Sequence, residues 1–334
     1  MEEESSSKNI IHYERKEILE QINKIGKYES GSTTIIKWED EMNKNTQMYI
    51  VKNNFKNLPF IGVVNFEFKR EGYCVNQYCN GDEYFGYYSN DFRNKHGIYI
   101  YKPKLIGTKF LSRQFYFGLW ENDIKEGRGI YLWLKENNVF NSHNKLYNPF
   151  NNFESSNFHA YIGEFEKNCF TKGTFLKKEG DNYFVFHGTY LKNFKKNGNN
   201  CFYYSAKLEE IFYGTFKNDI FIEGYVGKFN ENGELLDVVK YQNKKIIEKD
   251  NLNKSDNINI KSVNKKMLTF RNVIMSKDYF GNLYKIFKDV IDFKIKNMDN
   301  INIFNSEKYL DLMNIVASYN QVTIFKEIEK YINE

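Results

Sequence analysis

The stretch YFGLWENDIKEGRGIY, residues 116–131, sets a pattern that recurs through the middle of the chain. An aromatic residue, a glycine and a second aromatic residue alternate in its first part, which places all three on one face of a strand. A polar turn follows, and two glycines then lead to another aromatic residue, so the stretch predicts a β-hairpin. The residues that carry the pattern are Tyr116, Gly118, Trp120, Gly127, Gly129 and Tyr131.

The same pattern recurs in weaker form on both sides of this hairpin. Copies that start at residues 161, 186 and 212 are about 25 residues apart, a period that is typical of repeat arrays. Outside residues 116–131, one glycine of the G-x-G pair is replaced. The further copies contain Tyr84, Gly86, Tyr88, Gly97 and Tyr99; Tyr161, Gly163, Phe165, Gly173 and Phe175; Phe186, Gly188, Tyr190, Gly198 and Phe202; and Phe212, Gly214, Phe216 and Gly224.

These residues resemble those of the MORN repeat (membrane occupation and recognition nexus), whose pattern is Y-x-G-x-W/F, a short polar turn, G-x-G and an aromatic residue. The resemblance covers residues 55–243. It implies a mainly β protein with additional α-helices, built as an elongated antiparallel array of β-hairpins. Asn80-Gly81 predicts a type I′ hairpin turn, and Asn197-Gly198 and Asn232-Gly233 predict similar turns.

Regions with different patterns flank and interrupt the array. Apolar residues at helical spacing predict a short helix within residues 8–25 and helices after residue 262. The Asn-rich insertion is predicted to be a mobile surface loop, because such composition buries little apolar surface. The predicted division is an N-terminal cap over 1–54, the array over 55–243 with insertions at 102–113 and 136–157, a polar linker over 244–262 and a helical unit over 263–334.

Composition limits the function classes. Aromatic residues make up 18% of the chain, which suits a sheet whose face is tiled by rings. The 48 basic and 43 acidic residues are interspersed, so no concentrated basic face argues for nucleic-acid binding. The acidic, polar start is unlike a secretory signal, and there is no apolar run long enough to span a bilayer. These features predict a cytoplasmic protein, with peripheral association at a membrane or the cytoskeleton as a finer alternative.

We find no set of residues that predicts catalysis. The five histidines are isolated from one another and from any nucleophile motif, which favours structural or exposed roles. The G-x-G of residues 127–129 is not followed by a helix, as a dinucleotide site requires. The four cysteines lack zinc-site spacing and are interpreted as reduced, buried or half-buried thiols. We therefore expect no enzyme activity, cofactor or metal.

The resemblance implies a scaffold or adaptor that binds proteins, acting at a junction between cytoskeleton and membrane. The partner would be a protein, such as a helix or a cytoskeletal component, and an extended homodimer is also compatible with the resemblance. One alternative is an adaptor that binds anionic phospholipid through basic hairpin turns, because lysines near such a surface contribute about 1 kcal/mol each. Another is a regulatory subunit of an enzyme. The residues that would face lipid are Lys192, Lys195 and Lys196.

Two structural expectations follow from the repeat. Trp120 and its equivalents are expected to form one continuous aromatic row. A single-layer sheet must cover its apolar face, so the chain's own C-terminal helices are expected to occupy the face that carries this row. Their apolar stripes run from Leu283 to Ile291 and from Ile324 to Ile332. The row is predicted to contain Tyr88, Trp120, Phe165, Tyr190 and Phe216.

Overall fold

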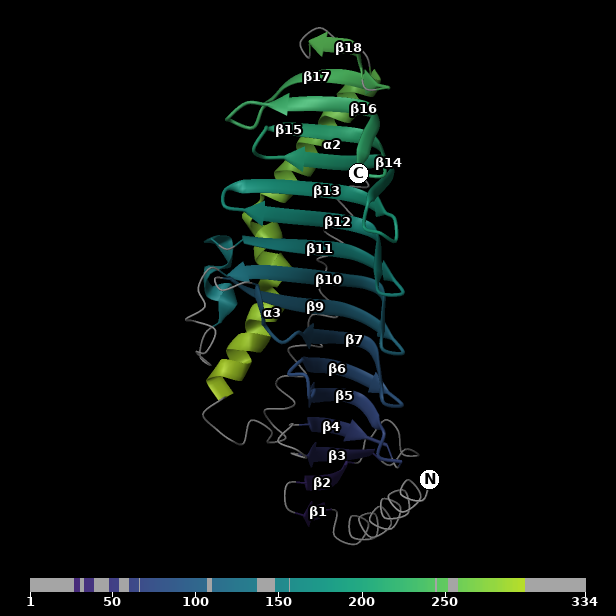
Figure 1. The fold of residues 1–334 in the computed structure, drawn as a ribbon, viewed down its shortest axis with the longest axis vertical. Coiled ribbons are helices and arrows are strands. Elements are labelled where there is room, and N and C mark those ends of the chain that lie inside the picture. Colours follow the sequence, from purple (N-terminus) through teal and green to yellow (C-terminus); the bar gives the residue numbers. More distant parts are fainter. Residues whose placement is uncertain are drawn as a thin grey trace.

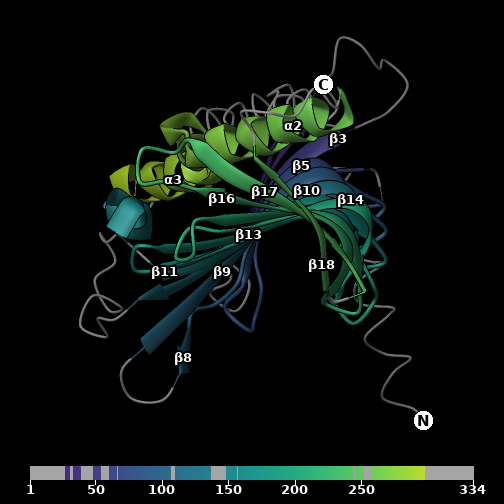
Figure 2. The ribbon, with the colours of Figure 1, turned by 90° about the horizontal axis from the view of Figure 1, so that it is seen from above.

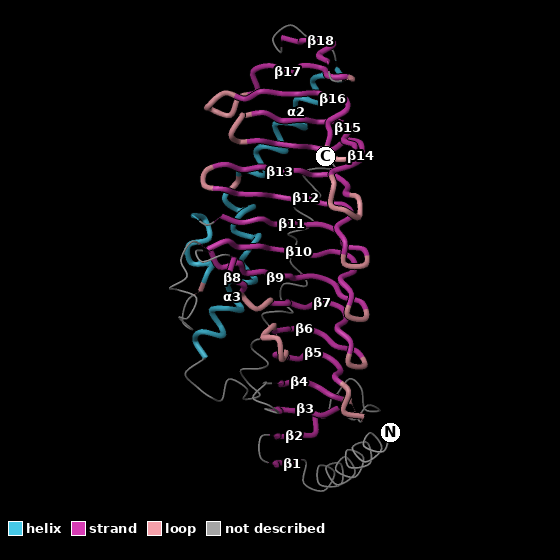
Figure 3. The backbone as a smooth tube through the Cα atoms, in the orientation of Figure 1, coloured by secondary structure: helices cyan, strands magenta, loops and turns pink. Residues whose placement is uncertain are grey.

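The computed structural model describes ten parts of the chain: residues 27–30, 33–38, 48–53, 60–65, 67–106, 110–136, 148–155, 157–243, 245–251 and 258–297. Their strands form one open antiparallel sheet. Apart from β8 (Lys104–Ile106), they are stacked in sequence order from β1 (Lys27–Ser30) at one end to β18 (Lys245–Asn251) at the other (Figure 1). The backbone trace shows the same meander, with short turns at one edge (Figure 3). The predicted mainly β hairpin array is thus the observed architecture.

The sheet extends beyond residues 55–243 in both directions, because strands before and after that range join it. The first insertion contains β8, which pairs with the beginning of β9, while the rest of β9 pairs with β7. The strands are β1 (Lys27–Ser30), β2 (Thr33–Trp38), β3 (Met48–Asn53), β4 (Phe60–Val64), β5 (Arg70–Gln77), β6 (Glu83–Ser89), β7 (Phe92–Ile100), β8 (Lys104–Ile106), β9 (Phe110–Glu121), β10 (Ile124–Glu136), β11 (Asn157–Glu166), β12 (Cys169–Glu179), β13 (Asn182–Tyr190), β14 (Lys196–Ser205), β15 (Glu210–Lys217), β16 (Ile220–Phe229), β17 (Leu235–Gln242) and β18 (Lys245–Asn251).

A line of glycines crosses the sheet from strand to strand, and the tyrosine rings of the repeat lie over it. A Cβ atom on Gly118 would be 2.5 Å from Tyr116 Oη, so the ring occupies the space that a side chain would need. The Tyr116 hydroxyl donates a hydrogen bond to the carbonyl of Leu119 at 2.7 Å. The pairs along the line are Gly86 with Gly97, Gly97 with Gly118, Gly118 with Gly129, Gly129 with Gly163, Gly163 with Gly173, and Gly173 with Gly188.

Irregular pairing next to these glycines bends the sheet. The register shifts between Gly163 and Phe165 and between Lys125 and Gly129, where Gly127 has a φ of +78°. Such bulges increase the local bend of a strand. Seen along the stack, the sheet curves away from the helices, so its other face is concave (Figure 2).

The predicted aromatic row is confirmed, with the first aromatic residue of each repeat inserted between its members. Neighbouring rings are 5.1–5.8 Å apart and meet edge to face at 78–89°. This geometry is the favoured one for aromatic pairs. In order along the sheet, the row is Tyr88, Tyr84, Trp120, Tyr116, Phe165, Tyr161, Tyr190, Phe186 and Phe216.

Two helices, α2 (Ile258–Met275) and α3 (Lys277–Asn297), cover the opposite face of the sheet (Figure 2). Phe202 stacks on Phe270 of α2 at 4.6 Å, and Phe115 contacts Phe287 of α3 at 5.4 Å. Phe115 is next to Tyr116 in β9, so the two rings point to opposite faces. The prediction that the C-terminal helices occupy the face of the aromatic row is therefore wrong. They dock on the residues that alternate with the row.

The second insertion is part of the core in its described portion. The 3₁₀ helix η3 (Pro149–Ser155) buries Phe150 and Phe153, each 1% exposed, against α3. The two rings lie 5.9 Å and 4.2 Å from the ring of Tyr284. The mobile-loop prediction is wrong here because two phenylalanines in an Asn-rich stretch supply enough apolar surface to dock it. Residues 137–147 lie outside the described residues.

Other boundaries also differ from those predicted. The predicted linker contains β18 and the first residues of α2. Asn80-Gly81 forms the predicted hairpin, but only Gly81 has a positive φ, so the turn is not type I′. Asn197-Gly198 lies within β14 rather than in a turn. The predicted helix within 8–25 and the stripe from Ile324 to Ile332 lie outside the described residues.

Candidate functional site

The sheet face opposite α2 and α3 is concave and carries the aromatic row, and we call this face the channel (Figure 2). A second set of rings, formed by Tyr101, Tyr131, Trp133 and Phe175, packs beside the row. Tyr131 stacks on Trp133 at 4.2 Å with an interplanar angle of 26°, and Tyr101 stacks on Tyr131 at 5.8 Å. The row is buried except for Tyr190, whereas Tyr101, Trp133 and Phe175 are half-buried. The channel side therefore presents aromatic surface to solvent.

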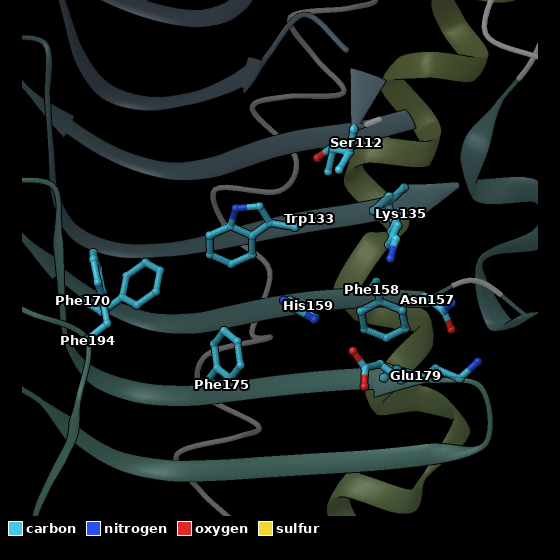
Figure 4. Close-up of a pocket in the computed structure, with 13 residues that line it drawn as sticks. Ser112, Trp133, Lys135, Asn157, Phe158, His159, Phe170, Phe175, Glu179 and Phe194 are labelled. Carbon is cyan, nitrogen blue, oxygen red and sulfur yellow. The ribbon is translucent and has the colours of Figure 1, made fainter. Parts of the chain in front are cut away.

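A cavity of 620 Å³ lies in the channel across β9 to β12 (Figure 4). Trp133 and Phe175 lie on the sheet beneath it, 6.4 Å apart, and Phe170 contacts Trp133 at 5.9 Å. Phe194, in the turn between β13 and β14, contacts Phe170 at 5.0 Å although its side chain is 55% exposed. This volume is within the range of ligand pockets, roughly 300–1,000 Å³.

One side of the same cavity is polar. It is formed at the strand ends by Ser112, Lys135, Asn157 and Glu179 (Figure 4). His159 pairs with Trp133 across β10 and β11 and meets the Phe175 ring edge-on at 5.9 Å. Burial lowers the pKa of His159, and the positive charges of Lys177 and Lys135 lower it further, against the opposing charge of Glu179. The histidine thus contributes a neutral ring at neutral pH. The cavity is aromatic at one end and polar at the other.

Cations lie over the rings at the turn side of the channel. The Arg93 guanidinium is 4.4 Å from the Trp120 ring and forms an ion pair of 2.7 Å with Asp123. The Lys125 ammonium lies 4.8 Å from the Tyr131 ring and donates a hydrogen bond to the Tyr101 hydroxyl at 2.8 Å. These basic turn residues are therefore part of the channel and not of a solvated rim.

The predicted repeat residues are brought together as one structural unit rather than as a binding site. Their tyrosines and glycines form the base of the channel and are mostly buried. Tyr131 joins that base to the half-buried rings. In the later copies, Gly198 has a φ of +110° at a bulge, and Gly214 pairs with Gly224.

The predicted lipid-facing lysines are not equivalent. Lys192 and Lys195 are exposed in the turn between β13 and β14. Lys196 instead lies 5.2 Å from the Tyr203 ring and 3.9 Å from Asp219. Only the first two lysines therefore present their charge to solvent in the way that a membrane contact needs.

Of the half-buried channel rings, Phe175 was predicted as a repeat residue, whereas Tyr101 and Trp133 were not among the predicted residues. Trp133 follows Tyr131 by two residues and Tyr101 follows Tyr99 by two, so strand alternation could have identified both. Phe194 could not be assigned in this way, because it lies in a turn that is longer than those of the regular repeats. His159 was placed among the isolated histidines, and its place in the cavity depends on pairing between β10 and β11.

The described residues contain no group of three His, Cys, Asp or Glu side chains placed to hold a metal ion. Cys74 and Cys201 are buried and Cys169 is half-buried, whereas Cys79 is exposed, contrary to the prediction for all four. Within the same described parts, neither helix is long and apolar enough to cross a bilayer. Searches of protein-family models and of curated proteins gave no match to this chain.

Proposed function

We propose that this protein is a non-catalytic scaffold that holds a segment of a partner protein in its channel. The observation that carries the proposal is the set of half-buried rings around the cavity, led by Trp133 and Phe175. Large aromatic residues in a depression are typical anchors of protein interfaces. Among the described residues, α2 and α3 cover the other face of the sheet and no helix covers the channel, which supports the channel as the face for an outside partner.

The dimensions favour a short amphipathic helix as the bound segment. The cavity crosses β9 to β12, and three spacings between neighbouring strands correspond to about 14 Å. A helix that runs along the channel covers this length with about ten residues. Its apolar side would contact the rings, and its polar side would face solvent.

The resemblance to MORN repeats supports a place for this scaffold between the cytoskeleton and a membrane. Such a role needs an extended, rigid surface rather than a closed catalytic pocket. The long sheet, stiffened by its edge-to-face aromatic row, provides that surface.

Affinity purification from the native cell tests the proposal when the full-length protein is compared with a channel variant. Trp133→Ala combined with Phe175→Ala should lose one or more proteins that the wild type retains. Leu208→Ala is the matched control, because Leu208 is a 55% exposed apolar residue in a turn outside the cavity. Equal recovery of every co-purifying protein by the three forms would contradict the channel as a binding surface, provided that thermal melting shows the channel variant to be folded.

The phospholipid alternative rests on Lys192 and Lys195, which are exposed beside Leu191, itself 36% exposed. If this turn binds membranes, co-sedimentation with anionic vesicles should decrease with salt and with Lys192→Glu/Lys195→Glu. Lys217→Glu/Lys228→Glu is a control with the same charge change on other exposed lysines. The absence of co-sedimentation at low salt would exclude this alternative.

A further inference from the structure

Successive hairpins are joined by a repeated contact between a basic residue and the next turn. The backbone N–H of the first or second residue in a strand donates a hydrogen bond of 2.8–2.9 Å to a side-chain oxygen in the following hairpin turn. The backbone N–H of that turn residue donates in return at 3.0–3.1 Å. The four pairs are Arg70 with Asp91, Arg93 with Asp123, Lys125 with Asn168, and Lys196 with Asp219.

Three of these pairs also neutralise the basic side chain, and one does not. The cation to carboxylate distances are 3.0 Å for Arg70, 2.7 Å for Arg93 and 3.9 Å for Lys196. In the remaining pair the turn residue is Asn168, whose amide oxygen accepts the backbone hydrogen bond but carries no charge. Among the described residues, Lys125 has no ion-pair partner. Its ammonium is therefore the uncompensated member of an otherwise neutralised series.

This ammonium lies beside the cavity. Lys125 Nζ is 4.8 Å from the centre of the Tyr131 ring, and that ring stacks on Trp133 at 4.2 Å. Lys125 itself is half-buried, and its Nζ has one hydrogen bond, to the Tyr101 hydroxyl. An ammonium has three donors, so two remain for another acceptor. Partial burial also reduces the screening that weakens exposed charge pairs.

We propose that Lys125 selects a partner segment that carries an Asp or Glu next to its apolar anchor. The anchor enters the cavity beside Trp133, and the carboxylate takes the position that Asp219 has relative to Lys196. This inference rests on the proposed function, and it adds the chemistry of the partner: an acidic amphipathic segment. The site exists because the turn position that is aspartate in the other three pairs is asparagine, Asn168, in this one.

A displayed library of random 16-residue peptides, selected on the full chain, provides the probe. Channel ligands are those peptides that compete with one another for the wild-type protein and do not bind the Trp133→Ala/Phe175→Ala variant. Among these, we expect enrichment of Asp or Glu close to a Trp, Phe or Leu. The best peptide is then titrated against Asn168→Asp, which places a carboxylate beside Lys125 within the chain itself.

Asn168→Asp should weaken this peptide about 5- to 10-fold, and Lys125→Gln should have a similar effect, since one partly exposed charge pair is at stake. Asn218→Asp is the matched control, because it adds the same charge at a left-handed turn residue elsewhere and should change affinity less than about twofold. Changing the acidic residue of the peptide to its amide should abolish the difference between wild type and Asn168→Asp.

The outcomes separate the two proposals. Channel peptides without acidic enrichment, or with equal affinity for wild type and Asn168→Asp, would overturn the role of Lys125 and leave the scaffold proposal standing. A library that yields no peptide sensitive to Trp133→Ala/Phe175→Ala would contradict both. Thermal melting of Asn168→Asp shows that the variant is folded, and a melting temperature at or above that of the wild type agrees with an added internal ion pair.

Discussion

Gly118 illustrates how single residues set the shape of the channel. Its Cα lies against Gly129 in the neighbouring strand, and the Tyr116 ring lies over both. Glycine is required here because no room is left for a side chain. Its backbone conformation does not require glycine, since its φ is not in the left-handed region. The ring in turn supplies an edge for Trp120 and for Phe165. One missing side chain thus permits two edge-to-face aromatic contacts.

Gly118→Ala should lower the free energy of unfolding by about 2–3 kcal/mol, because its Cβ would overlap Tyr116 and the Gly129 backbone. Gly281→Ala in α3 is the matched control. No atom lies within 4 Å of a Cβ at that position, and alanine favours helices, so it should be neutral or stabilising by up to about 1 kcal/mol. Urea denaturation measures both. A Gly118→Ala variant as stable as the wild type would contradict the packing of Tyr116 over the glycines.

His187 should make stability depend on pH. It lies under α2, with Nδ1 2.8 Å from Thr174 Oγ1 and its ring 6.3 Å from that of Phe270. Burial lowers the pKa of His187 to about 4, and the charge of Lys172 acts in the same direction. The folded state thus favours the neutral ring, while the unfolded state binds a proton near pH 6.5. This contribution is complete above pH 6.5 and is lost as pH falls towards 4.

The free energy of unfolding should therefore decrease by up to about 3 kcal/mol from this group between pH 6.5 and 4. His187→Gln should reduce that slope, measured by urea denaturation at several pH values. His96→Gln is the comparison, because the pKa of His96 is also lowered by burial, and its ring packs on Phe117 of the sheet whereas that of His187 packs on Phe270 of α2. If His187→Gln and wild type lose stability in parallel, His187 is not buried as a neutral ring.

At the scale of elements, η3 packs against α3 and holds it in place. Phe150 and Phe153 contact Tyr284 and Phe287, and Asn148 donates a hydrogen bond of 2.6 Å to Asp292. The hydrogen bonds from Asn148 and Lys288 lower the pKa of Asp292, against the opposing effect of burial. An insertion between two hairpins therefore holds a helix that lies more than 120 residues later in the chain.

Phe150→Ala should loosen α3 selectively. Loss of a buried phenylalanine costs about 3–5 kcal/mol, and most of its contacts are to η3 and α3 rather than to the sheet. Hydrogen exchange should become faster in residues 277–297, with little change in α2. Phe92→Ala, at a 49% exposed phenylalanine, should leave both helices protected. Equal acceleration in α2 and α3 would show that the helix pair undocks as one unit.

The sequence predicts hairpins well where glycines and aromatic residues keep their spacing, as in residues 116–131. It fails where order depends on a distant contact. The Asn-rich insertion contains little local signal for η3, because its two phenylalanines become ordered only by packing on α3. The cavity is a similar case, since Trp133, Phe175 and Phe194 come from three different hairpins. Only the alternation of Tyr131 and Trp133 is visible in one strand.

At the scale of the whole molecule, the two faces of one sheet have different uses. Phe115, Phe117 and Ile130 alternate with the repeat tyrosines and belong to the core that the sheet shares with the helices. Apolar side chains therefore occur on both faces of the sheet. The repeat pattern alone therefore does not indicate which face the helices cover. The aliphatic stripe of α3, from Leu283 to Val290, packs into the face whose residues vary among the repeats. The face with the repeated rings remains as the channel.

Site-specific photo-crosslinking in the native cell tests this assignment most directly. A benzoylphenylalanine placed at Phe175 samples the channel, and one at Met275, which is 40% exposed, samples the helix-covered side. We predict a discrete crosslinked protein adduct from position 175 that is lost when Trp133→Ala is added, and no such adduct from position 275. An adduct from position 275 together with none from position 175 would contradict the channel as the partner-binding face.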